Sequence, residues 1–83
     1  MKFQYYPETD SLYIDLSEKS SVESIEAAPG IVLDLDAEGH LVGIDIDNAS
    51  RTIDLSRLEV QEVPITSFRV KAPQGTVLEL SQK

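Results

Sequence analysis

The chain has 83 residues, which is enough for one domain with a small hydrophobic core. It contains no cysteine, so disulfides and thiolate metal sites are excluded as supports for the fold. Fifteen acidic residues against seven basic ones give a formal net charge of −8, which disfavours binding to nucleic acids and anionic membranes and favours encounter with a basic partner.

The first sixteen residues predict a β-hairpin. Phe3 and Tyr5 alternate with Gln4 and Tyr6, as the residues of a half-buried strand do. The alternation resumes at Leu12, Ile14 and Leu16. Between the two runs, the sequence Pro-Glu-Thr-Asp is typical of a turn, because proline fixes φ and the aspartate can accept hydrogen bonds from nearby backbone N–H groups.

Residues 22–28 predict a third strand with an irregularity. Val22 and Ile25 are three positions apart, which breaks strict alternation. Either a β-bulge or a short irregular strand accounts for this spacing. Pro29 and Gly30 then mark a tight bend.

Residues 31–36 and 41–47 form the clearest predicted hairpin. One register brings all its large alternating apolar residues to the same face, and it pairs Ile31 with Ile46, Leu33 with Ile44 and Leu35 with Val42. This register leaves residues 37–40 as the loop, where Gly39 can take a positive φ. It also puts Gly43 directly across from Asp34.

The remaining segment predicts one short helical turn and a second hairpin. The turn is placed near residues 54–58, where Asp54 or Ser56 can cap it. Strands follow at 65–70 and 76–80, with a turn at 72–75. The sequence thus predicts a mostly β, single domain over 1–83: a small antiparallel meander of about five strands plus a C-terminal hairpin. Since a sheet this small needs cover on its apolar face, we expect the second hairpin or a homodimer to provide it.

Four segments together resemble a prokaryotic domain-of-unknown-function family, number 2283. They read YPETDSLYI, PGIVLDLD, GHLVGIDI and NAS. The resemblance covers residues 3–58 and implies a compact β-rich domain without an assigned activity. It leaves 59–83 as an extension, expected to be two strands packed on the core. Some family members occur beside small toxin-like proteins, so the resemblance also implies an antitoxin-like role with a small basic protein partner.

No catalytic constellation is visible, so we expect no enzyme and no cofactor. The single histidine, His40, falls in the exposed loop of the second hairpin. An activated nucleophile needs a base within hydrogen-bond reach and a third group that orients it. Phosphate-binding glycine loops and zinc-ligand spacings are also missing from the sequence.

The candidate partner-binding face comprises Asp15, Asp34, Asp36, Asp45 and Tyr13. On this hypothesis an arginine or lysine of a basic partner enters the side-chain gap above Gly43, beside Asp34. A solvated acidic face that blunts aggregation explains the same aspartates. Both interpretations remain open at the level of sequence.

The alternative function is a divalent-metal or small-molecule binding protein that uses the aspartate cluster. Calcium and magnesium take oxygen ligands, so the residue types are suitable. However, Asp34 and Asp36 on one strand lie about 7 Å apart, too far to share one ion without water.

The N-terminal residues lack the apolar run of a signal peptide, and no apolar stretch reaches membrane-spanning length. A cytoplasmic location is therefore the expectation.

Overall fold

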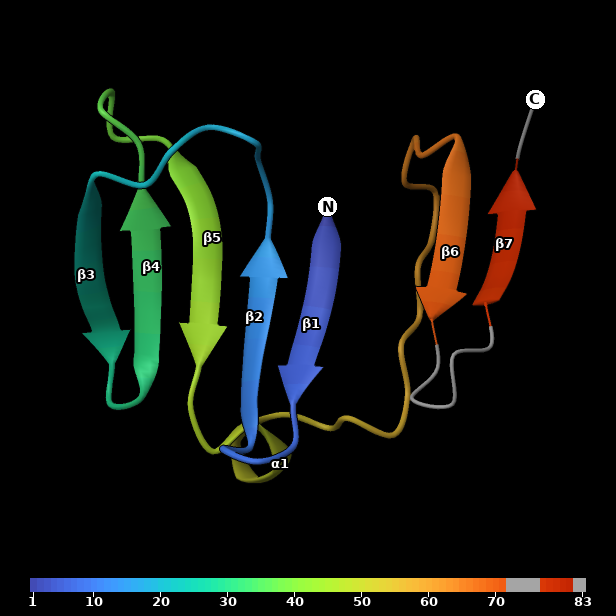
Figure 1. The fold of residues 1–83 in the computed structure, drawn as a ribbon, viewed down its shortest axis with the longest axis horizontal. Coiled ribbons are helices and arrows are strands. Elements are labelled where there is room, and N and C mark those ends of the chain that lie inside the picture. The colour runs from blue at the N-terminus through green and yellow to red at the C-terminus, as the bar shows by residue number, and fades with distance from the viewer. Residues whose placement is uncertain (72–76, 82–83) are drawn as a thin grey trace.

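The computed structural model describes residues 1–71 and 77–81. Its elements, in chain order, are β1 (Lys2–Tyr6), β2 (Ser11–Asp15), β3 (Glu23–Ala28), β4 (Ile31–Leu35), β5 (Leu41–Ile46), α1 (Ala49–Thr52), β6 (Ser67–Lys71) and β7 (Val77–Ser81). The first five strands form an antiparallel sheet in the order β1-β2-β5-β4-β3, and β6 and β7 form a sheet of their own (Figure 1). The predicted mostly β fold is confirmed.

The strand order differs from the predicted meander, because β5 and not β3 lies beside β2. The central strand, β5, contains the buried residues Val42, Gly43 and Ile46. By contrast, every residue of β3 is exposed, and its Glu23 and Glu26 suit a sheet edge. Burial thus favours the apolar strand in the middle and the charged strand at the edge.

The segment between β2 and β3 crosses the ends of β5 and β4, and two backbone hydrogen bonds hold it there. The Leu16 N–H donates to the Val42 carbonyl at 2.9 Å, and the Val22 N–H donates to the Leu35 carbonyl at 2.8 Å. This crossing carries the chain past two strands before β3 begins (Figure 1).

The register of the β4–β5 hairpin confirms two of the three predicted pairs. Ile31 faces Ile46 and Leu33 faces Ile44, but Leu35 faces Leu41 rather than Val42. A register shift between Asp34 and Leu35 causes the difference. The loop has the expected positive φ at Gly39, 82°. β3 has an irregularity as well, between Glu26 and Ala28.

The register gives the five-stranded sheet two chemically different faces. One, called the apolar face below, presents Phe3, Tyr5, Leu12, Ile14, Ile25, Ile31, Leu33, Ile44 and Ile46. The other, called the polar face, presents Lys2, Gln4, Tyr6, Ser11, Tyr13, Asp15, Ser24, Glu26, Val32, Asp34, Gly43 and Asp45. The small core lies at one end of the apolar face, where Leu12, Ile46 and Ala49 pack together.

The short helix lies at Ala49–Thr52 and not at the predicted residues 54–58. Ala49 is fully buried against the sheet, which anchors the turn. Asp10 from the β1–β2 turn accepts a hydrogen bond from the backbone N–H of Ser50, so a distant residue serves as the helix cap. Asp54 accepts a hydrogen bond from the backbone N–H of Ser56, but this segment forms only a turn and not a helix. The helix position is thus decided by tertiary contacts.

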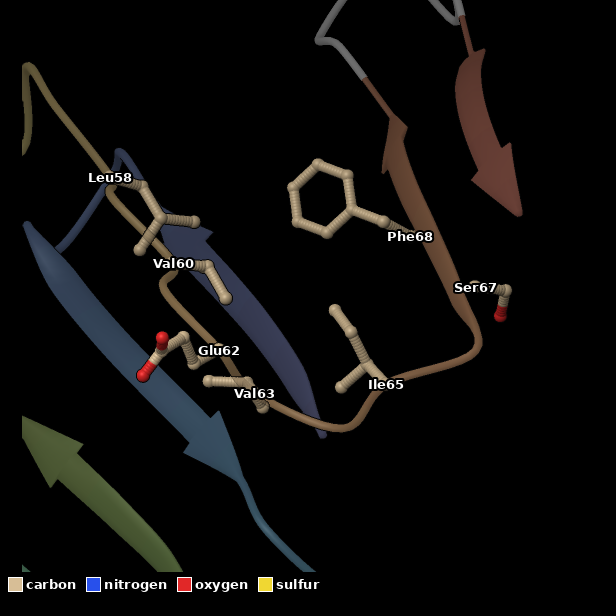
Figure 2. A pocket seen from close by; sticks show the side chains of 7 residues that line it. All are labelled: Leu58, Val60, Glu62, Val63, Ile65, Ser67 and Phe68. Carbon is tan, nitrogen blue, oxygen red and sulfur yellow. The ribbon is translucent and has the colours of Figure 1, made fainter. Parts of the chain in front are cut away.

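The C-terminal extension forms the two predicted strands, β6 and β7, and its packing on the core stays a prediction. The extensive contacts of β6 and β7 are with each other. Figure 2 shows Phe68 and Ile65 pointing across a groove toward Leu58 and Val60. The side chains of Ile65 and Phe68 therefore turn toward the linker that precedes β6. The predicted turn at 72–75 lies outside the described residues.

Within the described part of the chain, no helix is long and apolar enough to cross a membrane.

Candidate functional site

A hydrogen-bonded cluster crosses the middle of the polar face. Tyr13 on β2 reaches over β5, and its Oη donates to Asp34 Oδ2 on β4 at 2.9 Å. From the edge strand β3, Ser24 Oγ donates to Asp34 Oδ1 at 2.7 Å. Side chains of three strands, β2, β3 and β4, are thereby linked through one carboxylate, which is held in a fixed orientation.

Gly43 makes the reach of Tyr13 possible. A Cβ at this position would collide with the Tyr13 hydroxyl and lie 2.6 Å from its Cζ. The side-chain gap that the sequence predicts above Gly43 is therefore filled by Tyr13, and an incoming arginine or lysine cannot enter it. A glycine inside a strand is the signal for such a close approach, although the sequence does not say which side chain makes it.

Asp45 lies next to this cluster, opposite Tyr13 on β2 and Val32 on β4. Its pKa is raised above the ordinary value, first by burial and then by the negative charges of Asp47 and Asp34. Burial, followed by the hydrogen bond to Asp34, also raises the pKa of Tyr13, so its hydroxyl stays protonated at neutral pH. The cluster combines a fixed hydrogen-bond donor with crowded carboxylates.

Asp15 completes the group of carboxylates on this face. It pairs with Gly43 across β2–β5 and with Lys2 across β1–β2. Within residues 1–71, neither Asp15 nor Asp34 nor Asp45 forms an ion pair. The structure thus brings four of the five predicted residues, Tyr13, Asp15, Asp34 and Asp45, to one face.

The fifth predicted residue, Asp36, lies apart in the β4–β5 loop. It is 7% exposed, and its Oδ1 accepts hydrogen bonds from the backbone N–H groups of Glu38 and His40 at 2.9 and 2.8 Å. The hydrogen bond from His40 is the largest of the causes that lower its pKa. Its second oxygen lies 3.7 Å from Nδ1 of the exposed His40. Alternation ends at Leu35, the last residue of β4, so Asp36 shapes the loop instead of joining the polar face.

The described residues contain no group of three or more histidine, aspartate or glutamate side chains placed to hold a metal ion. The aspartates of the polar face are spread over three strands, which keeps them from converging on one point. The metal-binding alternative has no geometric support among these residues.

Asp10 is a second polar centre, although its place in the sequence indicates only a turn residue. Its carboxylate accepts hydrogen bonds from Tyr5 Oη at 2.7 Å and from the Ser50 hydroxyl at 2.7 Å. The bond from Ser50 is the largest cause of its lowered pKa, followed by the bond from Tyr5. The sequence signal was available, since Asp10 and Ser50 belong to two of the four segments that resemble the family.

Fold and site together define a small β protein whose central sheet has an apolar face and an acidic, tyrosine-containing face. The chain belongs to the family described as "Protein of unknown function (DUF2283)", whose model matches residues 2–50, more than half of the chain. The match ends just after the start of α1, so it is shorter than the predicted 3–58. No curated protein and no solved structure matches the chain.

Proposed function

We propose that this protein is a non-catalytic protein-binding module whose polar face binds a basic protein. One observation supports this most directly: the Asp45 carboxyl lies beside Asp34 and Asp47 with no cationic partner among the described residues. Its raised pKa means that ionisation at this position is unfavourable in the free protein. A lysine or arginine from a partner would relieve that cost.

The surroundings of Asp45 suit recognition of a partner. Asp34 is fixed by the hydroxyls of Tyr13 and Ser24, so its charge is presented in one orientation. Since Tyr13 fills the space above Gly43, a basic side chain would approach beside the tyrosine ring and not beneath it. There the ring can contact the aliphatic stem or guanidinium of that side chain.

Long-range charge supports the same partner chemistry. A net charge of −8 accelerates encounter with a basic protein and slows encounter with acidic ones. An antitoxin-like role, in which the partner is a small basic toxin, is the specific form of this proposal.

The test is a pull-down with the tagged full chain from the cells that naturally produce it. The site variant is Asp15→Asn with Asp45→Asn, which removes two charges from the polar face. The matched control is Glu8→Gln with Glu18→Gln, which changes the net charge equally but at two exposed positions outside the sheet. Asp34 is left intact because it holds Tyr13 and Ser24.

We expect the unaltered chain and the control to retain one small basic protein in near-stoichiometric amount, and the site variant to lose it. Equal loss from both variants would mean that net charge, and not this face, determines binding. Recovery of nothing beyond what an unrelated acidic domain recovers would overturn the proposal.

A further inference from the structure

The apolar face of the five-stranded sheet is covered at the end where α1 packs, and Val42 is buried near the opposite end of β5, but much of the face between them and at its edges is exposed or only partly buried. Figure 1 shows no described helix or strand lying across the middle of the sheet. At its edges Phe3 is 51% exposed and Ile25 is 43% exposed. In the central strands Ile14, Leu33 and Ile44 are only partly buried. Apolar side chains that alternate this regularly are normally covered by a second layer.

The amount of exposed surface points to a missing layer of protein. A compact folded monomer of this mass exposes about 4900 Å². This protein, at 9.2 kDa, exposes 6930 Å². A stable protein–protein interface removes about 800 Å² from each partner. The excess is therefore larger than one such interface requires.

The distribution of charge indicates which partner fits this face. Among strand residues, Glu23 is the only charged one whose register places it with the apolar face. Asp15, Glu26, Asp34 and Asp45 all belong to the polar face. A second copy also carries a charge of −8, so it can approach closely only through a face that is nearly free of charge.

We infer that the apolar face is an interface with a second copy of this chain, which packs sheet against sheet as a β-sandwich. The two inner faces would interdigitate with the sheets about 10 Å apart. A two-fold axis makes such a patch self-complementary, so that Ile14 and Ile44 of each copy meet those of the other. Both polar faces then point outward, which leaves two acidic surfaces for partners.

The C-terminal extension is the competing cover for this face. Two of its apolar side chains, Ile65 and Phe68, point toward Leu58 and Val60 instead (Figure 2). No extensive contact joins β6 or β7 to the larger sheet among the described residues. The second copy is therefore the occupant that the charge and the contacts favour.

The first test is sedimentation equilibrium of the full chain over a dilution series. We expect a species of twice 9.2 kDa that dissociates to 9.2 kDa on dilution. A concentration-independent monomer would overturn the inference.

Two variants on β1 locate the interface. Phe3→Glu and Tyr6→Glu both replace an exposed aromatic residue of the same strand with the same charge, but on opposite faces of the sheet. We expect Phe3→Glu to run as a 9.2 kDa monomer with an unchanged circular dichroism spectrum, and Tyr6→Glu to dimerise like the unaltered chain. Dimerisation of both variants, or its loss in both, would exclude the apolar face.

A measurement on the unaltered chain covers the case in which Phe3→Glu does not fold. In a mixture of isotope-labelled and unlabelled copies, isotope-filtered NOE spectra report only contacts between copies. We expect such contacts at the methyl groups of Ile14, Ile25 and Ile44. If these contacts between copies are missing, and a conventional NOE spectrum joins the same methyl groups to Leu58 or Phe68, the extension covers the face and the inference is wrong.

Discussion

Residues 1–53 and the region after them, which is the extension together with the linker 54–58 that is counted with it below, contain apolar side chains of the same types, yet they bury them very differently. The first region contains all buried residues of the described chain, namely Leu12, Asp36, Val42, Gly43, Ile46 and Ala49. In the extension, Leu58 is 60% exposed and Val60 is 47% exposed. Only Ile65 and Phe68 are partly buried among its described side chains.

Hydrogen bonds separate the two regions in the same way. In the first region, Tyr13 bonds Asp34 and Ser50 bonds Asp10, residues that are far apart in sequence. After residue 53, by contrast, the Ser56 hydroxyl and backbone N–H bond Asp54, only two residues away. The comparison teaches that apolar content does not make a core: a residue such as Leu12 is buried because strands pair on both sides of its own and Ala49 of α1 packs against it.

The largest predicted effect tests this contrast at its centre. Ile46→Ala should lower the free energy of unfolding by about 2–5 kcal/mol, because it empties a core position that is 7% exposed. Leu58→Ala should change it by no more than about 0.5 kcal/mol, because that side chain is largely in water. Chemical denaturation followed by circular dichroism measures both. Similar losses would contradict the division into a packed and an unpacked region.

A smaller effect tests the close approach on the polar face. Gly43→Ala should cost about 1–3 kcal/mol, because the new methyl group must displace Tyr13. The same change in a Tyr13→Ala background should cost much less, because the colliding ring is gone. The double-mutant cycle isolates this coupling. Equal costs in the two backgrounds would show that the strand conformation, and not Tyr13, requires glycine.

The next effect concerns pH. The folded-state pKa of Asp45 lies above its ordinary value of 3.8, so ionisation of Asp45 at neutral pH destabilises the fold. Asp45→Asn should therefore stabilise the protein at pH 7, and this gain should shrink as the pH falls through the raised pKa and vanish below 3.8. Denaturation series at several pH values measure it.

Asp36 provides the control, because its pKa is shifted in the opposite direction to that of Asp45. Its folded-state pKa is lowered, so its ionised form contributes stability above 3.8 that is lost as the pH falls through the folded-state pKa. Asp36→Asn should be destabilising at pH 7 and close to neutral in acid. If both substitutions shift stability in the same direction, the assignment of one carboxylate to the polar face and the other to the loop is mistaken.

The smallest effect on stability should come from cutting the extension. Trypsin should cleave first after Arg57, which is 79% exposed in a segment without regular structure. Lys19 is also exposed, but backbone bonds at Leu16 and Val22 hold its loop. Mass spectrometry gives the order of cleavage, and the unfolding midpoint of the trimmed chain should hardly move. Earlier cleavage after Lys19 would show that the loop between β2 and β3, and not the segment around Arg57, is the weakest part of the chain.

Local pattern was sufficient for much of this fold. Alternation located the strands, separated apolar from polar faces and predicted the pairs Ile31–Ile46 and Leu33–Ile44, because side chains on a strand alternate regardless of context. It also brought Asp15, Asp34 and Asp45 to one face and put Gly43 across from Asp34.

Tertiary structure decided the rest, because it depends on competition between residues that are distant in sequence. β5 is the central strand because its apolar residues gain the most burial from neighbouring strands on both sides. The pattern of one strand does not show this, because it depends on a comparison with the other strands. The helix formed where Asp10 could cap it and Ala49 could be buried. Tyr13 can bond Asp34 only because β2 lies beside Gly43 of β5. Asp36 is not on the polar face because the pairing of β4 with β5 ends one residue earlier, at Leu35.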